Sequence, residues 1–235
     1  TPYTGLTCFI ARHKKIKFLY HLSSDIEADK LDTNPLHYLN FRMLDNLFKT
    51  YGLRNSTYRI SQTLYQKENL QRNLNLSSHV ISNGHEVPSK RFIKDKTINV
   101  LWVANIKRLK RIELFLKLAS LFQNKDYIFY CIGSFQERAN SYEFRVRNIC
   151  ESLPNVKYMG YLSLEEVNLL FEKSHILVHT GNLEGYPNTF IQAWLRNMVV
   201  LSLTIDPDNV LTTKKIGFLG GDYDNFVRKF QYLVS

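Results

Sequence analysis

Cysteine, long hydrophobic runs and repeated segments are scarce in this chain, and each scarcity excludes a class of protein. The three cysteines, Cys8, Cys131 and Cys150, are too few and too scattered for a disulfide framework or a cysteine metal site, so we expect reduced thiols in a cytoplasmic protein. No stretch of about 18 apolar residues is present, which argues against a transmembrane helix. The absence of internal repeats and low-complexity tracts excludes repeat and compositionally biased proteins.

What is present is an ordinary globular composition. Of the 235 residues, 44% are hydrophobic and 22% are charged, enough for one large or two small domains. The first residues, Thr1-Pro2-Tyr3-Thr4, contain neither an initiator Met nor the start of a signal peptide. We therefore expect the chain to be a fragment of a longer protein.

Basic residues exceed acidic ones, with a formal net charge of +10. The excess is spread along the chain, and two local clusters stand out at residues 12–17 and 107–111. Nucleic acid, anionic lipid and phosphorylated small molecules all attract such clusters. No helix-turn-helix, zinc or aromatic–basic motif accompanies them, so we expect no nucleic-acid partner. For residues 12–17, a solvated surface is the simpler interpretation.

From about residue 97 onward, apolar strand patterns alternate with helical ones. Strands are predicted at residues 98–103, 127–132, 156–159, 175–179 and 198–203, and helices at 110–122, 136–150, 164–171 and 187–196. Such alternation indicates an α/β fold with a parallel sheet covered by helices on both faces. In such folds ligands bind beyond the carboxyl ends of the strands, so the segments after these strands are the candidate site.

The first part of the chain predicts a smaller α/β unit. Strands are expected at 17–21 and 57–61, and helices at 36–51 and 63–74. The segment 80–88 contains Asn83-Gly84 and Pro88, which mark a turn and a break. We interpret it as a hinge, with an amino-terminal domain at residues 1–88 and a carboxy-terminal domain at 89–235.

Residues 184–194 join the strand that ends at His179 to a helix through a carboxylate, a glycine and a proline. Pro187 suits the first turn of a helix, and the N–H groups of Asn188 and Thr189 would point out of the helix start. Such a start attracts phosphate, while Glu184 can accept hydrogen bonds from sugar hydroxyls. The alternative is an ordinary strand-to-helix connection with a capping Glu.

This segment resembles the paired-glutamate signature of the family-4-type retaining glycosyltransferases. The resemblance implies a GT-B fold of two Rossmann-like, doubly wound parallel-sheet domains, of which the first is partial here. Roughly 100 residues at the front, judged from the usual size of such a domain, and the closing helix are expected to be absent. It also implies that Glu184 contacts the transferred sugar, with Gly185 and Tyr186 in the donor-binding turn. The second glutamate position, which binds the ribose, holds Gln192, an uncharged amide.

The same resemblance implies further donor-binding residues. Lys110 matches a lysine that contacts the diphosphate, where a fixed cation stabilises the leaving group. Asn105 stands where the family has an arginine, and Arg108 or Lys107 would replace that cation if the loop turned it inward. Gly133 and Ser134 resemble a loop whose main chain approaches the nucleotide. Tyr161 lies in a segment that resembles the one whose main chain meets the nucleobase.

His21 resembles a histidine that faces the interdomain cleft. It would hydrogen-bond a sugar hydroxyl or assist proton transfer, and a structural histidine at a strand end is the alternative. His85 and His179 are interpreted as structural. The family generally needs no divalent metal ion, and we expect no cofactor beyond the nucleotide-sugar co-substrate.

The sequence therefore predicts a retaining glycosyltransferase that moves a sugar from a UDP- or GDP-linked donor to a glycan or lipid-linked acceptor, in polysaccharide or glycolipid biosynthesis. A peripheral location at the cytoplasmic face of the membrane is expected if residues 12–17 bind anionic lipid. The alternative is a catalytically impaired relative that binds nucleotide sugar or acts as a scaffold, which Asn105 and Gln192 favour.

Overall fold

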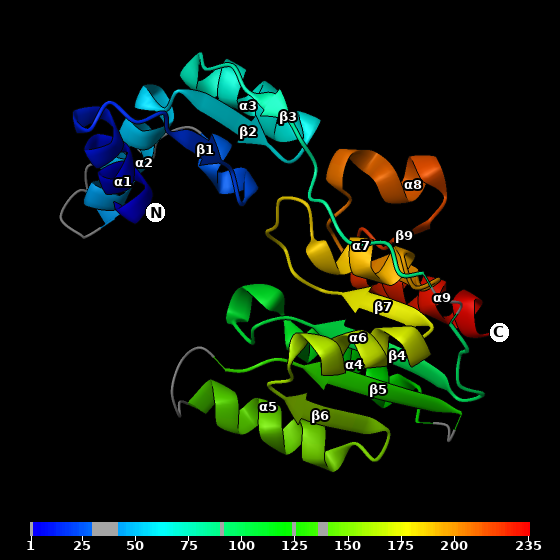
Figure 1. The fold of residues 1–235 in the computed structure, drawn as a ribbon. Helices are drawn as coiled ribbons and strands as arrows, with labels where there is room; N and C mark the ends of the chain where they lie inside the picture. The colour runs from blue at the N-terminus through cyan, green and yellow to red at the C-terminus, as the bar shows by residue number, and fades with distance from the viewer. Residues whose placement is uncertain (1, 30–41, 90–91, 124–125, 136–140) are drawn as a thin grey trace. The chain divides into compact units, whose positions relative to one another are not determined.

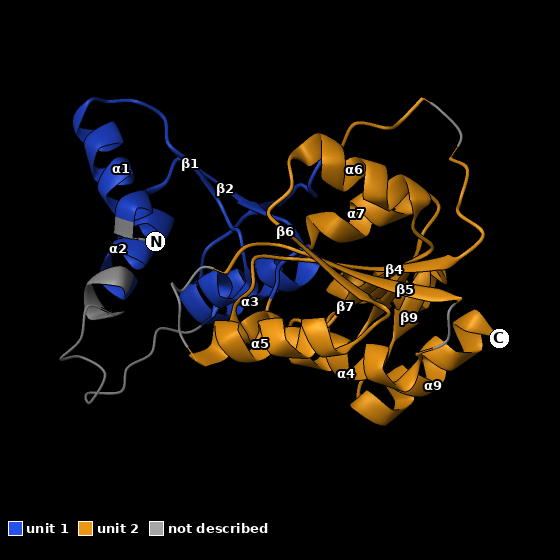
Figure 2. Ribbon diagram, turned by 90° about the horizontal axis from the view of Figure 1, so that it is seen from below, with its two compact units in different colours: residues 1–84, 184–186 blue, residues 85–183, 187–235 orange. Residues whose placement is uncertain are grey.

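The computed structural model describes residues 2–29, 42–89, 92–123, 126–135 and 141–235. The chain forms two compact units (Figure 2). Unit 1 comprises residues 1–84 together with 184–186, and unit 2 comprises residues 85–183 and 187–235. Both are α/β units built on parallel sheets, as predicted. The two compact units divide after Gly84. The domain boundary expected after residue 88 stays a prediction.

Unit 1 contains a three-stranded parallel sheet in the order β1-β2-β3, with β1 at Leu19–His21, β2 at Tyr58–Ser61 and β3 at His79–Val80. Its helices are α1 (Pro2–His13), α2 (Arg42–Asn55) and α3 (Leu64–Leu74), with a short 3-10 turn, η1, at Asp25–Ala28. The first six residues of the helix predicted at 36–51 lie outside the described residues. The core gathers aromatic and aliphatic side chains, namely Tyr20, Leu22, Ala28, Leu53, Leu70 and Leu74.

Unit 2 contains a six-stranded parallel sheet in the order β6-β5-β4-β7-β8-β9. The strands are β4 (Ile98–Val103), β5 (Tyr127–Ile132), β6 (Val156–Gly160), β7 (Ile176–His179), β8 (Val199–Ser202) and β9 (Gly217–Leu219). The helices are η3 (Arg108–Lys110), α4 (Ile112–Leu121), α5 (Ser141–Ser152), α6 (Leu164–Lys173), α7 (Asn188–Trp194), η4 (Pro207–Asn209), α8 (Val210–Lys214) and α9 (Tyr223–Val234).

Helices cover both faces of this sheet, because successive side chains of a strand point to opposite sides. Val100 and Trp102 of β4 belong to one core with side chains of α4, α5 and α9. Leu101, between them in sequence, belongs to a second core with side chains of α6, α7 and α8. Figures 1 and 2 show α6 and α7 on one side of the sheet and α4, α5 and α9 on the other. The doubly wound arrangement predicted for residues 89–235 is confirmed.

The predicted helix at 110–122 is interrupted at its start. Lys110 closes a 3-10 turn, and Arg111 takes a left-handed conformation (φ 50°, ψ 48°) before α4 begins at Ile112. The first five residues of the helix predicted at 136–150 lie outside the described residues, and α5 spans Ser141–Ser152. Helices α1, α8 and α9 and strand β9 were not predicted. None of the helices formed by the described residues is long and apolar enough to span a bilayer.

Candidate functional site

The predicted donor-site residues of unit 2 follow strands whose carboxyl ends share one edge of the sheet. Val103, the last residue of β4, pairs in register with Ile132 of β5, and Ile132 pairs with Gly160 of β6. Asn105, Gly133 and Tyr161 therefore follow three adjacent strand ends. On the other side of β4, the strand β7 ends at His179.

A buried hydroxyl joins the loop after β4 to the loop after β7. Thr180 has no exposed surface. Its Oγ1 accepts a hydrogen bond from the indole Nε1 of Trp102 (2.9 Å) and donates one to the carbonyl oxygen of Lys110 (2.7 Å). The amide of Asn182 adds a third tie, to the carbonyl oxygen of Leu109 (3.3 Å). Thr180 was not singled out from the sequence, because its role depends on strand order.

Arg111 ties the same region together through its guanidinium. Nε donates to the carbonyl oxygen of Thr180 (2.6 Å) and Nη2 donates to Oγ1 of Thr204 (3.0 Å). That hydroxyl in turn donates to the carbonyl oxygen of Gly181 (3.1 Å). Burial lowers the pKa of Arg111 from its usual value, an effect partly offset by Glu113. Arg111 therefore connects the loops after β4, β7 and β8.

Lys110 lies against the end of β7. A methyl group placed on Gly181 would lie 3.5 Å from Cδ of Lys110 and 3.1 Å from the His179 ring. Gly181 is buried and Lys110 is half-buried. The predicted diphosphate lysine thus lies beside residues 179–181.

Arg108, one of the two residues expected to replace the missing arginine, packs against α5. The Arg108 guanidinium lies over the ring of Tyr142 in α5, 4.9 Å from its centroid. Lys107 and Asn105 are exposed. Arg108 therefore packs on an aromatic ring, and its role as a replacement for the missing arginine stays a prediction.

Gly133 lies where the loop after β5 meets the loop after β4. Its φ is +144°, and a Cβ there would lie 1.8 Å from the carbonyl oxygen of Ala104, so no other residue fits without a shift. Its N–H donates to the carbonyl oxygen of Gly160 (2.8 Å). The carbonyl oxygen of the next residue, Ser134, accepts from the amide of Ile106 (2.8 Å). The side chain of Tyr161 is 80% exposed.

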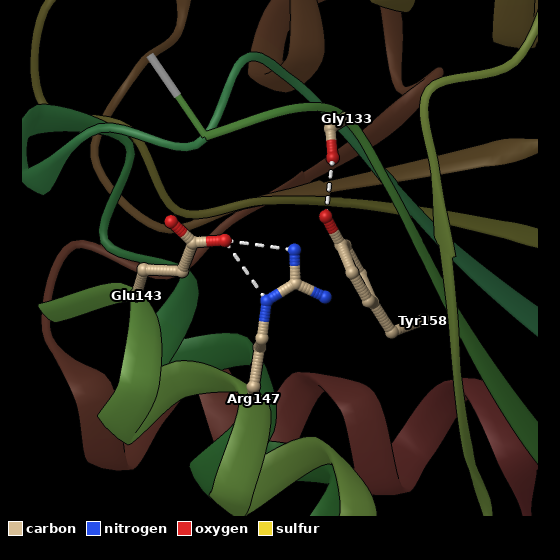
Figure 3. Close-up of polar contacts among 4 residues, drawn as sticks. All are labelled: Gly133, Glu143, Arg147 and Tyr158. Atoms are coloured by element: carbon tan, nitrogen blue, oxygen red, sulfur yellow. Dashed lines mark hydrogen bonds and ion pairs between the residues drawn. The ribbon is translucent and has the colours of Figure 1, made fainter. Parts of the chain in front are cut away.

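Figure 3 shows Tyr158 of β6 hydrogen-bonded to this glycine, with Arg147 and Glu143 of α5 nearby. The Tyr158 hydroxyl donates to the carbonyl oxygen of Gly133 (3.1 Å). The Arg147 guanidinium lies 5.1 Å from the centroid of the Tyr158 ring and 5.2 Å from that of Phe135. Arg147 also pairs with Glu143 one helical turn away, at 2.8 Å. These residues were not predicted, and an i, i+4 pair of this kind reads as solvated helix surface in a sequence.

Helix α7 begins one residue after Pro187, whose φ of −62° suits its position as the cap. Asn188 is exposed, and its Oδ1 lies 3.2 Å from Nε2 of His85. Thr189 and Gln192 are half-buried, and the main-chain oxygen of Gln192 accepts from Arg196 (3.3 Å). The strand–turn–helix pattern of this segment is confirmed, and its ligand contacts stay predictions.

Glu184, Gly185 and Tyr186 belong to unit 1. The amide of Tyr186 donates to Oε1 of Gln62 (2.9 Å), and a Cβ on Gly185 would lie 2.6 Å from Nε2 of Gln66. His21 is also in unit 1, as the exposed last residue of β1. The predicted pairing of Glu184 and His21 with Lys110 of unit 2 stays a prediction.

Residues 206–208 and 222–224 each form an Asp-x-Asp triplet, and the first aspartate of each has a local structural role. Asp206 accepts hydrogen bonds from the amides of Leu211 (2.7 Å) and Thr212 (3.2 Å). Asp222 caps α9 by accepting from the amide of Asn225 (2.8 Å). Among the described residues, no group of three or more His, Cys, Asp or Glu is placed to hold a metal ion.

Comparison with solved structures shows the GT-B fold. The S. aureus TarM mutant crystallised with Fondaparinux, alpha-GlcNAc-glycerol and UDP is 17% identical over 99% of this chain and 47% of its own, with a TM-score of 0.78. Anabaena HepE in complex with UDP-glucose is 14% identical over 100% of this chain and 67% of its own (TM-score 0.77). Sucrose-phosphate synthase from Thermosynechococcus elongatus is 13% identical over 98% and 62% (TM-score 0.78).

The chain spans about half the length of the TarM chain that it matches. No curated protein sequence matches it significantly. The sequence model of one family, described as "Glycosyl transferases group 1", matches residues 97–235, which is more than half of the chain. The chain therefore belongs to the glycosyl transferases group 1 family.

Proposed function

We propose that this chain is part of a retaining glycosyltransferase that uses a nucleoside-diphosphate sugar. The observation that carries the proposal is the position of Lys110, held by the loop after β7 at the carboxyl edge of the sheet, within the segment that matches the family. UDP is the first donor to test, because TarM was solved with UDP and HepE with UDP-glucose. GDP-linked sugars are the second.

In the proposed reaction, the diphosphate leaves with the electron pair of the anomeric carbon–oxygen bond. A hydroxyl of a glycan or lipid-linked acceptor forms the new bond on the same face and passes its proton to the departing diphosphate oxygen. The Lys110 ammonium neutralises charge on the leaving oxygen. Glu184 accepts hydrogen bonds from the donor sugar, His21 contacts a sugar hydroxyl, and the Gln192 amide meets the ribose.

The test is transfer by the full-length enzyme from a panel of UDP- and GDP-sugars. Lys110→Ala should lower kcat about 100-fold, as the loss of one charge-stabilising group typically does, and Glu184→Ala should lower kcat/KM by a comparable factor. Lys96→Ala and Glu165→Ala, which remove exposed charges elsewhere in unit 2, serve as matched controls. Wild-type rates in both site variants would rule out the assignment.

A donor-binding protein without turnover is the second candidate. Two observations favour it: Asn105 is exposed where the family carries an arginine, and Gln192 lacks the charge of the family's glutamate. Calorimetry with UDP and GDP, run beside the transfer assay, separates the two. Micromolar binding with no transfer to any acceptor would favour the second candidate.

The proposed partner of the basic cluster at residues 12–17 is an anionic membrane surface. It begins with Arg12 and His13, the last two residues of α1, a helix on which Phe9 and Ile10 are 55% and 51% exposed. Each basic residue near such a surface contributes about 1 kcal/mol. Replacing Lys14, Lys15 and Lys17 with Gln should reduce sedimentation with phosphatidylglycerol vesicles and leave binding to neutral vesicles unchanged. Equal sedimentation before and after replacement would contradict this part of the proposal.

A further inference from the structure

The residue after strand β7, Thr180, is fastened to two consecutive residues of the loop after β4. Its hydroxyl donates to the carbonyl oxygen of Lys110, and its own carbonyl oxygen accepts from the Arg111 side chain. The same hydroxyl accepts from the indole of Trp102, a residue of β4 that is 2% exposed. Both hydrogen-bonding directions of one hydroxyl are therefore used inside the fold.

These bonds act on the point where the chain turns from η3 into α4. Lys110 closes the 3-10 turn by donating its N–H to Lys107 (2.9 Å), and the next residue is left-handed. The peptide between Lys110 and Arg111 is therefore the pivot of the turn, and the Thr180 hydroxyl holds its carbonyl oxygen. A rotation of this peptide would change the direction in which the Lys110 side chain leaves the backbone.

We infer that Thr180 is a positioning residue for Lys110. Its hydroxyl fixes the Lys110 peptide against Trp102, so that the ammonium is presented at one place on the carboxyl edge of the sheet. The inference rests on the proposed function, because it assigns to Thr180 the orientation of the cation that would meet the diphosphate. It predicts that loss of the Thr180 hydroxyl lowers kcat only by displacing the Lys110 side chain.

Thr180→Val and Thr180→Ser form the test pair. Valine keeps the branched shape and removes the hydroxyl, whereas serine keeps the hydroxyl and removes only the methyl group. Thr213→Val makes the same change in α8, where the exposed Thr213 hydroxyl only donates to the carbonyl oxygen of Asn209. If Thr180→Val does not fold, Thr180→Cys retains a similar volume with a much weaker donor.

Thr180→Val should lower kcat roughly tenfold to a hundredfold, the range produced by small displacements of a reacting group, and should change the KM for the donor by less than about threefold. Thr180→Ser and Thr213→Val should keep kcat within about threefold of wild type. In a Lys110→Ala background, Thr180→Val should cause no further loss, because non-additivity identifies residues that act as one unit. Full activity in Thr180→Val, or an equal fold loss with and without Lys110, would overturn the inference.

A readout without turnover keeps this inference distinct from the proposed function. Lysine side chains of the full chain are reductively methylated with ¹³C, and the Lys110 signal is assigned by its absence in Lys110→Ala. Thr180→Val should shift that signal and Thr180→Ser should leave it in place. If the wild type neither binds UDP nor transfers sugar, the proposed function fails, and an unshifted Lys110 signal in Thr180→Val overturns the positioning role by itself.

Discussion

On both sides of β4, side chains join the loops that follow neighbouring strands, but their exposure to solvent differs. We call the side toward β7 and β8 the β7 flank and the side toward β5 and β6 the β6 flank. Toward β7 and β8, the ties are made by Thr180, Trp102 and Arg111, and the first two are almost completely buried. Toward β5 and β6, they are made by Tyr158 and Arg147, and the Arg147 side chain is 45% exposed. Hydrogen bonds in a water-excluded region are stronger and costlier to break than those in solvent. The β7 flank should therefore be the rigid one.

The largest effect is expected from breaking the β7 flank at Arg111. Arg111→Ala removes two hydrogen bonds from a charged donor and leaves the carbonyl oxygen of Thr180 without that partner, which should lower the free energy of unfolding by about 2 kcal/mol. Arg111→Gly removes the same bonds and relieves the left-handed backbone, so it should be less destabilising than Arg111→Ala by about 1 kcal/mol. Urea unfolding measures both. A glycine variant no more stable than the alanine variant would contradict the backbone argument.

A pH-dependent effect is expected at the other end of the β4–β7 pair. The main-chain N–H of Asn99 donates to Nδ1 of His175 (3.1 Å). This hydrogen bond requires a neutral imidazole ring, because a protonated Nδ1 cannot accept. Burial, and then the charge of Lys94, lowers the pKa of His175. The unfolded chain therefore binds this proton at higher pH than the folded chain does. Stability should be fully present above the unfolded pKa of about 6.5 and should decline as pH falls below it.

His175→Asn replaces the ring-nitrogen acceptor with an amide oxygen and removes the titration. It should flatten the decline in unfolding free energy between pH 7.5 and pH 5, measured by urea unfolding at constant ionic strength. His13→Asn, at the exposed end of α1, is the control and should leave the decline unchanged. The same decline in His175→Asn as in wild type would show that another group is responsible.

The smallest effect is expected on the β6 flank. Tyr158→Phe removes one hydroxyl from a half-buried ring and keeps its contacts with Arg147 and Phe135, so the free energy of unfolding should fall by about 0.5–1 kcal/mol. Thermal unfolding beside Arg111→Ala gives the comparison directly. If Tyr158→Phe is as destabilising as Arg111→Ala, solvent exposure does not explain a difference in stability between the two sides of β4.

The sheet of unit 2 was largely predictable because its signal is local. The apolar runs at residues 98–103 and 127–132 coincide with β4 and β5, since a strand buried on both faces has no alternation to obscure its ends. Helix α9 carried a readable pattern as well, with Phe226 and Phe230 spaced by one helical turn, and it was overlooked. Helix α1 was missed because it packs mainly against α2, a tertiary contact that no local pattern encodes.

The candidate site was predictable only where a residue type carries its own chemistry. Lys110 could be proposed because it matches the diphosphate-contacting lysine of the family that the chain resembles, and a fixed cation suits that role. Thr180 and Tyr158 could not, because their roles arise from partners about 70 and 25 residues away that only the strand order brings together. A threonine after an apolar strand has the same appearance in sequence whether its hydroxyl is buried or solvated.

The crowding at Gly133 has a consequence for any nucleotide that approaches this loop. Its amide hydrogen is already given to Gly160, and its carbonyl oxygen already receives one from Tyr158. With its single N–H already used, this residue has no main-chain donor left for a base or ribose, so any hydrogen-bond donation along this stretch would fall to Ser134 next to it.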